Sequence, residues 1–260
     1  MLNNKMKLVC GITTKNEEWI IGKTLSVLIN FCDKIIILDD NSTDKTKDIC
    51  CSFENVEWYV REKRKPHDRQ EAAGLYHLFK LISSHEPDYI LILDADEIPT
   101  PSFIEFFKNI DSTISAWKIR MINLYGDDKH YRVDSFITPS GISINWNPFN
   151  ANSWRKTVLL KYDKTYSYKY NLEVQKGGTS SYHPAPKNLT GKIITTTDFY
   201  IIHYGKINPS YINGDKDRFY AEIESSDGRD TYEKCLARHI ECRTSGTPVL
   251  KKCPREWFWT

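Results

Sequence analysis

The stretch YILILDADE, at Tyr89–Glu97, joins an apolar run directly to three carboxylates. A short, unbroken apolar run predicts a strand that is buried on both faces, as in the centre of a parallel sheet. Asp94 and Asp96 are two residues apart, so in extended backbone their side chains point the same way and can face one ion. The stretch therefore predicts a central strand that ends at a polar site.

Two apolar runs upstream end in the same manner. Leu8–Thr13 leads into TKNEE at Thr14–Glu18, and Ile35–Leu38 leads into DDNSTD at Asp39–Asp44. A fourth strand is predicted at Val56–Tyr59, and helical patterns separate the runs at residues 18–30, 44–51 and 69–83. This alternation is typical of βαβ units, so we predict an α/β fold with a mostly parallel central sheet flanked by helices.

The second half of the chain has a looser pattern. Shorter strand-like runs occur at Trp117–Leu124, Thr157–Lys161 and Phe199–His203, and the residues from Pro209 onward look helical again. We therefore predict a mixed α+β half that is followed by a helical extension.

The acidic residues that follow the first strands are predicted to converge. In an open α/β sheet, ligands bind beyond the carboxyl ends of the parallel strands. Carboxylates gathered there repel one another unless a cation or hydrogen-bond donors balance them. Oxygen ligands favour Mg²⁺ or Mn²⁺, and diphosphate oxygens could complete the coordination shell. The pattern therefore indicates a site for a metal ion and a diphosphate.

Simpler explanations cover part of this pattern. Asn41, Ser42 and Asp44 suit a turn and a helix N-cap, and an isolated DxD could be a solvated loop. Neither explains two carboxylates placed directly after a buried strand. Two other nucleotide-binding motifs are incomplete. A P-loop that ended at Gly22-Lys23-Thr24 would need a glycine at position 17, where Glu17 stands. The GxGxxG of a dinucleotide-binding fold does not follow the first strand.

Composition argues against several classes of partner. The 260 residues carry 36 Lys+Arg and 34 Asp+Glu, a net charge of +2, so no overall field attracts nucleic acid. No apolar run has the length of a signal peptide or a transmembrane segment, so we expect a soluble, cytoplasmic protein. The seven cysteines lack the paired spacing of a disulfide framework. A zinc cluster is disfavoured because the usual CxxC pairs are missing among its candidates, Cys235, His239, Cys242 and Cys253.

The three motif segments together resemble the family 2 glycosyltransferases of the GT-A fold. That family has a segment similar to TKNEE after its first strand, an acidic run before Ser-Thr-Asp, and a DxD, which here takes the DADE form. The resemblance covers residues 7–110. It implies transfer of a sugar from a nucleoside-diphosphate sugar, with a UDP-sugar favoured, and inversion at the sugar carbon.

The resemblance also implies roles for particular residues. Asp94 and Asp96 would hold Mn²⁺ or Mg²⁺ together with the diphosphate, Asp96 as a catalytic residue, and Asp39 or Asp40 would contact the base or the ribose. The other implied contacts of the nucleotide-sugar are Thr13, Glu17, Arg69 and Ala95.

The implied domain division places a GT-A catalytic domain at residues 1–205 and a helical extension, packed on it, at 206–260. Within the domain, residues 1–125 would bind the nucleotide-sugar and residues 126–205 the acceptor, which could be a glycan, a lipid-linked molecule or a protein. Aromatic residues are dense in the acceptor half and suit sugar faces, with Trp146 and Trp154 the expected exposed pair.

Transfer also needs a base that deprotonates the acceptor hydroxyl. The candidates are Glu173, Asp163 and Asp134, and Glu173 is preferred because its distance after the DxD suits the family's catalytic carboxylate. His203 is a candidate third metal ligand because Mn²⁺ accepts imidazole, although a histidine at a strand end can equally be a hydrogen-bonded loop residue. Arg218, in the segment that follows, is predicted to contact the donor.

Two rival functions fit parts of this pattern. A sugar-1-phosphate nucleotidyltransferase would normally show a glycine-rich, basic loop after the first strand, and Thr13–Glu18 is neither. A non-catalytic binding module would keep the nucleotide-sugar pocket but release no nucleotide.

Overall fold

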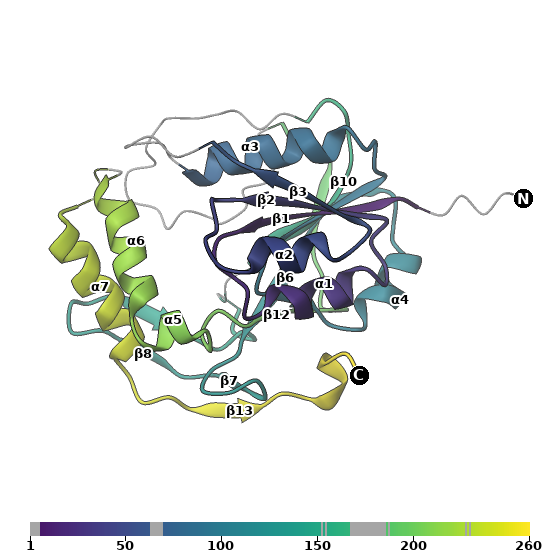
Figure 1. Cartoon of the computed structure of the whole chain (residues 1–260). Coiled ribbons are helices and arrows are strands. Elements are labelled where there is room, and N and C mark those ends of the chain that lie inside the picture. Colours follow the sequence, from purple (N-terminus) through teal and green to yellow (C-terminus); the bar gives the residue numbers. More distant parts are fainter. Residues whose placement is uncertain are drawn as a thin grey trace, which may run out of the picture.

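The structure is a computed structural model that describes residues 6–62, 70–151, 153, 155–166, 186, 188–226, 228 and 230–260. Arg69, Trp154 and Glu173, three of the candidate residues, lie outside the described residues. Figure 1 shows a central sheet between helices, with a second group of helices beyond one end of the strands.

Four parallel strands form the first half of the sheet. β1 (Leu8–Thr14) lies between β2 (Lys34–Asp39) and β4 (Tyr89–Asp94), and β3 (Val56–Val60) pairs with the other side of β2. These are the strands that the apolar runs predict, each slightly longer than expected. Because the four strands are parallel, their carboxyl ends meet at one edge of the sheet.

The second half continues the same sheet in mixed directions. β10 (Arg155–Lys161) runs antiparallel to both β4 and β6 (Ile114–Asn123), and β12 (Ile201–His203) runs parallel to β6. β5 (Glu97–Pro99) pairs antiparallel with β12, and β11 (Lys192–Thr195) pairs with β6. Consequently β6 and β12 end at the same edge as β4, whereas β10 begins there.

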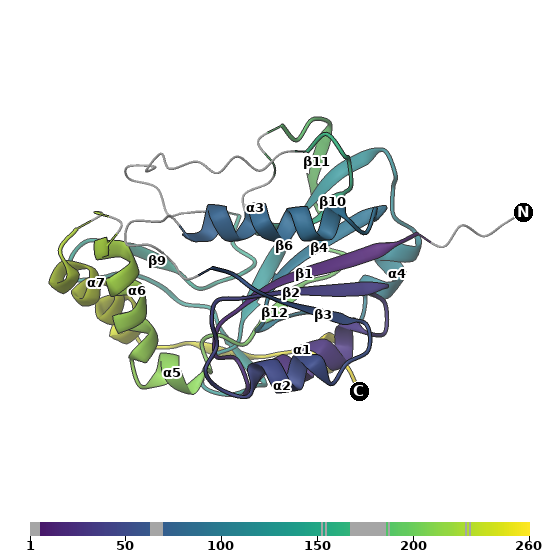
Figure 2. The same ribbon diagram turned by 45° about the horizontal axis from the view of Figure 1, so that its top comes forward.

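Helices cover both faces of this sheet, as Figures 1 and 2 show. α1 (Ile21–Leu28), α2 (Thr46–Cys51) and α4 (Phe103–Lys108) lie on one face, and α3 (Gln70–Ser83) lies on the other. Their apolar side chains form two core clusters with the strands between them. The two layers bury both faces of the strands, as their unbroken apolar runs require.

The strand residues alternate between these two clusters. In β4, Leu91 and Leu93 pack on the side of α1, whereas Ile90 and Ile92 pack on the side of α3. Gly11 in β1 allows α3 to approach, because a Cβ at this position would lie 2.5 Å from Cδ1 of Ile82.

Three helices of the C-terminal segment lie beyond the carboxyl ends of the strands in Figure 1. They are α5 (Pro209–Ile212), α6 (Asp215–Ser226) and α7 (Tyr232–Thr244), and the chain after them runs back beneath the sheet. The segment is not helical throughout, because β13 (Leu250–Lys252) pairs with β7 (His130–Arg132) and a short 3₁₀ turn follows at Arg255–Trp257. A small hairpin of β8 (Ser135–Ile137) and β9 (Ser143–Asn145) lies in the predicted acceptor half.

The thiols considered for zinc have other surroundings. Cys235 and Cys253 are buried, and Nε2 of His239 lies 3.3 Å from Oε2 of Glu224. Within the described residues, no three His, Cys, Asp or Glu side chains are grouped so that they could hold a metal ion. None of the described helices combines the length and the apolar character that crossing a bilayer requires.

Candidate active site

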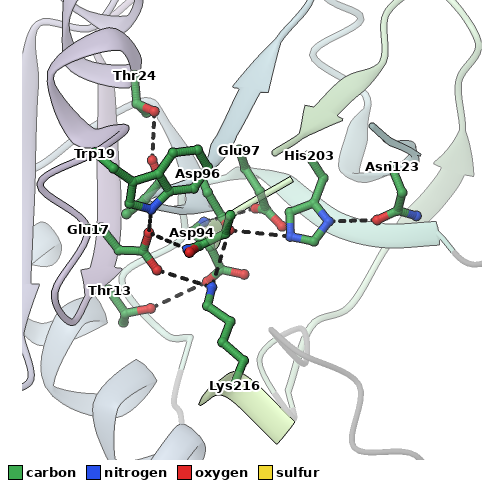
Figure 3. Close-up of polar contacts among 12 residues, drawn as sticks. Thr13, Glu17, Trp19, Thr24, Asp94, Asp96, Glu97, Asn123, His203 and Lys216 are labelled. Atoms are coloured by element: carbon green, nitrogen blue, oxygen red, sulfur yellow. Dashed lines mark hydrogen bonds and ion pairs between the residues drawn. The ribbon is translucent and has the colours of Figure 1, made fainter. Parts of the chain in front are cut away.

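Polar side chains from several strand ends meet at the carboxyl edge of the sheet. Thr13 and Asp94 are register partners on β1 and β4, and the Thr13 hydroxyl donates to Oδ1 of Asp94 at 3.4 Å. Asn123 and His203 are register partners at the ends of β6 and β12. Figure 3 shows these side chains around a common region, and the side chain of Lys216 extends into that region from α6.

The TKNEE and DDNSTD segments hydrogen-bond to each other. Asn16 and Asn41 have φ angles of 53° and 59°, a left-handed conformation that asparagine tolerates better than most residues. Oδ1 of Asn16 accepts from the backbone N–H of Thr43 at 2.8 Å, and the Glu17 N–H donates to the Thr46 hydroxyl oxygen at 2.9 Å. The two asparagines therefore shape these loops, so the turn explanation accounts for part of the motif.

The two aspartates after β2 have different surroundings. Asp39 is buried, and its carboxylate accepts from the N–H of Ser42 at 2.8 Å and from the Ser42 hydroxyl at 2.5 Å. Asp40 faces two cations instead, with Oδ1 3.5 Å from Nε of Arg61 and Oδ2 3.8 Å from Nζ of Lys15. Both aspartates are buried, and Asp39 holds the turn, whereas Asp40 lies between the charges of Arg61 and Lys15.

A buried lysine fixes the first carboxylate of the DxD. The ammonium of Lys156, at the start of β10, donates to Oδ2 of Asp94 at 2.9 Å and to the two oxygens of Glu97 at 2.6 and 2.7 Å. Burial lowers the pKa of Lys156, but the two carboxylates raise it more, so the pKa lies above its usual value. Lys156 thus holds the Asp94 side chain in place. Because 33% of that side chain stays exposed, a ligand can still reach it.

Asp96 faces a histidine and a second lysine. Its Oδ2 lies 3.6 Å from Nε2 of His203 and 3.8 Å from Nζ of Lys216. Burial raises the pKa of Asp96, but the charge of His203 and its hydrogen bond, together with Lys216, lower the pKa below its ordinary value.

The orientation of His203 is set by Asn123. Nδ1 of His203 lies 2.6 Å from Oδ1 of Asn123. Because an amide oxygen only accepts, Nδ1 carries the proton, and Nε2 is the ring atom that faces Asp96. A carboxylate oxygen and an imidazole nitrogen can face each other in this way when either a proton on Nε2 or a cation lies between them.

Gly205 keeps space open beside this pair. A Cβ at position 205 would lie 2.5 Å from Nε2 of His203 and 2.8 Å from Oδ2 of Asp96. Gly205 is not one of the glycines with positive φ, so the space, rather than the backbone conformation, favours glycine here. A carboxylate oxygen and an imidazole nitrogen suit Mn²⁺, so the residues present fit a divalent cation.

Glu17 lies on the other side of Lys216. It accepts from Nε1 of Trp19 at 2.6 Å and from Nζ of Lys216 at 3.3 Å. Burial raises the pKa of Glu17 to about 7, Asp96 adds to the rise, and Lys216 opposes it. Glu17 and Asp96 therefore share the charge of Lys216, which lies 3.3 Å from Oε1 of Glu17 and 3.8 Å from Oδ2 of Asp96.

Two of the predicted contacts of the nucleotide-sugar are occupied differently, although Ala95 lies between Asp94 and Asp96. Ala95 is buried, and its carbonyl accepts from the Thr24 hydroxyl at 2.6 Å. Arg218 is exposed, and its guanidinium pairs with Asp215 on the same helix. The structure therefore does not support the expected contact between Arg218 and the donor, because Lys216 is the α6 cation that reaches the site.

Of the two described candidates for the general base, Asp163 lies at the opposite edge of the sheet and Asp134 is bound by an arginine. Asp163 follows β10 at the amino end of β4, where the Tyr162 N–H donates to the Asp88 carbonyl. Asp134 receives two donors of the Arg132 guanidinium, at 2.6 and 2.7 Å. The geometry therefore disfavours both.

The chain belongs to glycosyl transferase family 2, whose family model matches residues 10–169. The match spans the TKNEE, DDNSTD and DADE segments and continues through β10. The family predicted from these three segments is therefore confirmed.

Particular relatives agree with this assignment. The SPbeta prophage-derived glycosyltransferase SunS of Bacillus subtilis (strain 168) is 26% identical over 198 residues, which are 71% of this chain and 42% of SunS. This chain thus spans less than half the length of that relative. The crystal structure of S. aureus TarS 1-349 is similar with a TM-score of 0.50 and 14% identity, over 90% of this chain and 71% of TarS 1-349. The fold is the GT-A fold, as predicted.

Proposed function

We propose that this chain is a metal-dependent, inverting glycosyltransferase that transfers a sugar from a nucleoside-diphosphate sugar, with a UDP-sugar favoured, to an acceptor hydroxyl. The observation that carries the proposal is the approach of Asp96 Oδ2 to His203 Nε2, at 3.6 Å, beside Gly205. A divalent ion would satisfy two acceptors that face each other. Membership of the family supports the same class of reaction.

Each residue at the carboxyl edge would then have a defined task. A bound Mn²⁺ or Mg²⁺ would neutralise the charge that develops on the departing diphosphate. Asp96 and His203 would hold the ion, and Asn123 keeps His203 in the required tautomer. Asp94, directed by Lys156, would complete the DxD beside the donor. The ammonium of Lys216 lies where it could bind phosphate oxygens.

The nucleoside is proposed to lie over the ends of β1 and β2, with Thr13, Glu17 and Asp40 around it.

Asp40→Asn is expected to raise the dissociation constant of UDP by about tenfold, because a hydrogen bond to a charged group is lost. Titration calorimetry with UDP and Mn²⁺ measures the change. Asp39→Asn is the matched comparison, and it should mainly lower the melting temperature, since Asp39 holds the turn. Unchanged UDP affinity in Asp40→Asn would show that the nucleoside does not bind beside Asp40.

Glu173 remains the proposed general base, since Asp163 lies at the opposite edge of the sheet and the carboxylate of Asp134 is bound by Arg132. Glu173→Gln should lower kcat by about 10² or more and leave UDP affinity intact, because the base acts only on the acceptor. Steady-state transfer rates and UDP binding, measured on the same preparation, separate the two quantities. Normal turnover in this variant would exclude Glu173 as the base.

Release of the nucleotide separates the proposal from its alternatives. UDP-, GDP- and dTDP-sugars would be incubated with the chain and Mn²⁺, with and without EDTA. We expect UDP to be released from a UDP-sugar and EDTA to stop the release. Binding without release would support a non-catalytic module, and formation of a nucleoside triphosphate from added pyrophosphate would support a nucleotidyltransferase.

A further inference from the structure

Lys206 is a half-buried cation with no carboxylate partner among the described residues. It lies three residues after His203, in the segment that leads to α5. Its ammonium lies 4.2 Å from the ring centroid of Tyr211 and 5.5 Å from that of Trp146. Burial, together with the charge of Lys216, lowers the pKa of Lys206 to about 8.

The carboxylates whose charge acts on Lys206 already have other partners. They are Asp96, which faces His203 and Lys216, and Asp217, which accepts from Nε of Arg243 at 2.6 Å. A desolvated ammonium is costly unless an opposite charge approaches it. The aromatic rings offset part of this cost, and they leave the ammonium able to take an oxyanion.

The surrounding aromatic group contains two more donors without an acceptor. We call Tyr125, Arg132, Trp146, Lys206 and Tyr211 the Trp146 cluster. The Arg132 guanidinium is fully buried and lies 5.2 Å from the centroid of the Trp146 ring. Within the described part of the chain, its Nη1 and the indole N–H of Trp146 are buried without a hydrogen-bond partner. Trp146 is thus half-buried, with its indole N–H turned inward, and its cluster holds two donors that are free to take an acceptor.

We propose that the Trp146 cluster is a subsite for a phosphate or carboxylate group of the acceptor. Trp146 comes from the segment after β9, and Lys206 and Tyr211 come from the segment after β12, so two segments near the active site frame the subsite. The ammonium binds the oxyanion, and the rings pack against the adjoining part of the acceptor. The inference rests on the proposed function, and it narrows the acceptor to a molecule with negative charge near the reacting hydroxyl.

The donor diphosphate is the other possible source of an oxyanion, and lysine acetylation distinguishes the two. The rate at each lysine would be mapped by mass spectrometry at pH 8 in the presence of saturating UDP and Mn²⁺. We expect inorganic phosphate to slow acetylation of Lys206 by about fivefold, because an ammonium in an ion pair is less reactive. Lys234, whose side chain is 70% exposed, should be unaffected. Protection by UDP and Mn²⁺ alone, with no further effect of phosphate, would overturn the acceptor subsite.

A variant gives the second measurement. Lys206→Met keeps a long side chain against the rings and removes the charge, so it should weaken phosphate binding to the UDP-saturated chain by about tenfold. Its UDP affinity should stay unchanged. Arg218→Met removes an exposed cation on α6 and should alter neither affinity. Unchanged phosphate affinity in Lys206→Met, or an equal loss of UDP affinity, would overturn the proposal. Failure of the wild-type chain to bind UDP would instead contradict the proposed function.

Discussion

Replacing Asp96 with asparagine is expected to lower the rate of sugar transfer by about 10³-fold, or ~4 kcal/mol of transition-state stabilisation. Asparagine keeps the size of the side chain but removes the charge that faces His203 and Lys216 at 3.6 and 3.8 Å. The ion that neutralises the departing diphosphate would lose its anionic ligand. UDP release from a UDP-sugar in the presence of Mn²⁺ measures the loss.

Asp163→Asn is the matched control for this variant. Asp163 is an aspartate at the opposite edge of the sheet, so its replacement should change neither transfer nor Mn²⁺ binding. Asp96→Asn should also lose Mn²⁺ affinity, measured by the electron paramagnetic resonance of free Mn²⁺, while circular dichroism shows a folded chain. Full turnover in Asp96→Asn would exclude Asp96 as a metal ligand.

Gly205→Val is expected to have the second large effect, smaller than that of Asp96→Asn, although it removes no charged group. The added Cβ would lie 2.5 Å from Nε2 of His203 and 2.8 Å from Oδ2 of Asp96, so both atoms must move. Displacing a proposed metal ligand in this way should weaken Mn²⁺ binding and transfer by about 10- to 100-fold. His203→Ala, which removes one of the two proposed ligands outright, should show a similar loss of Mn²⁺ affinity.

Gly22→Ala supplies the comparison for a glycine with room beside it. A Cβ at Gly22 would meet only Cγ2 of Ile49, at 3.4 Å, so this substitution should leave Mn²⁺ binding unchanged. If Gly205→Val folds and binds Mn²⁺ as tightly as the wild-type chain, the space beside His203 is not the metal position.

The first half of the fold can be predicted from the sequence because its elements are consecutive. Apolar runs end in polar segments at Thr14, Asp39 and Asp94, and each run is a parallel strand whose carboxyl end lies at the common edge. Local periodicity and the rules for βαβ units are sufficient there, since β1, β2 and β3 pair in chain order and β4 then pairs with the free side of β1.

The second half depends on pairings that the spacing of residues does not reveal. Lys156 reaches Asp94 and Glu97 only because β10 inserts antiparallel beside β4, and Asn123 meets His203 only through the pairing of β6 with β12. Lys156 follows Arg155 and stands one residue before the predicted strand Thr157–Lys161, so the sequence gives no signal that it is buried.

The choice between two cations of α6 depends on helix phase. Lys216 and Arg218 are two residues apart, so they lie on nearly opposite sides of the helix, and only one of them can face the site. Lys216 contacts Glu17 and Asp96, whereas Arg218 is exposed. The sequence places a basic segment after His203, and the position of the helix then selects the residue.

A crystal structure with UDP and Mn²⁺ tests the central claim most directly, because anomalous scattering identifies the manganese position. The account predicts one manganese peak bonded to the Asp96 carboxylate and to Nε2 of His203, each at about 2.2 Å, with diphosphate oxygens among the other ligands. UDP bound without manganese, or a manganese peak more than about 5 Å from Nε2 of His203, too far for a direct bond, would contradict it.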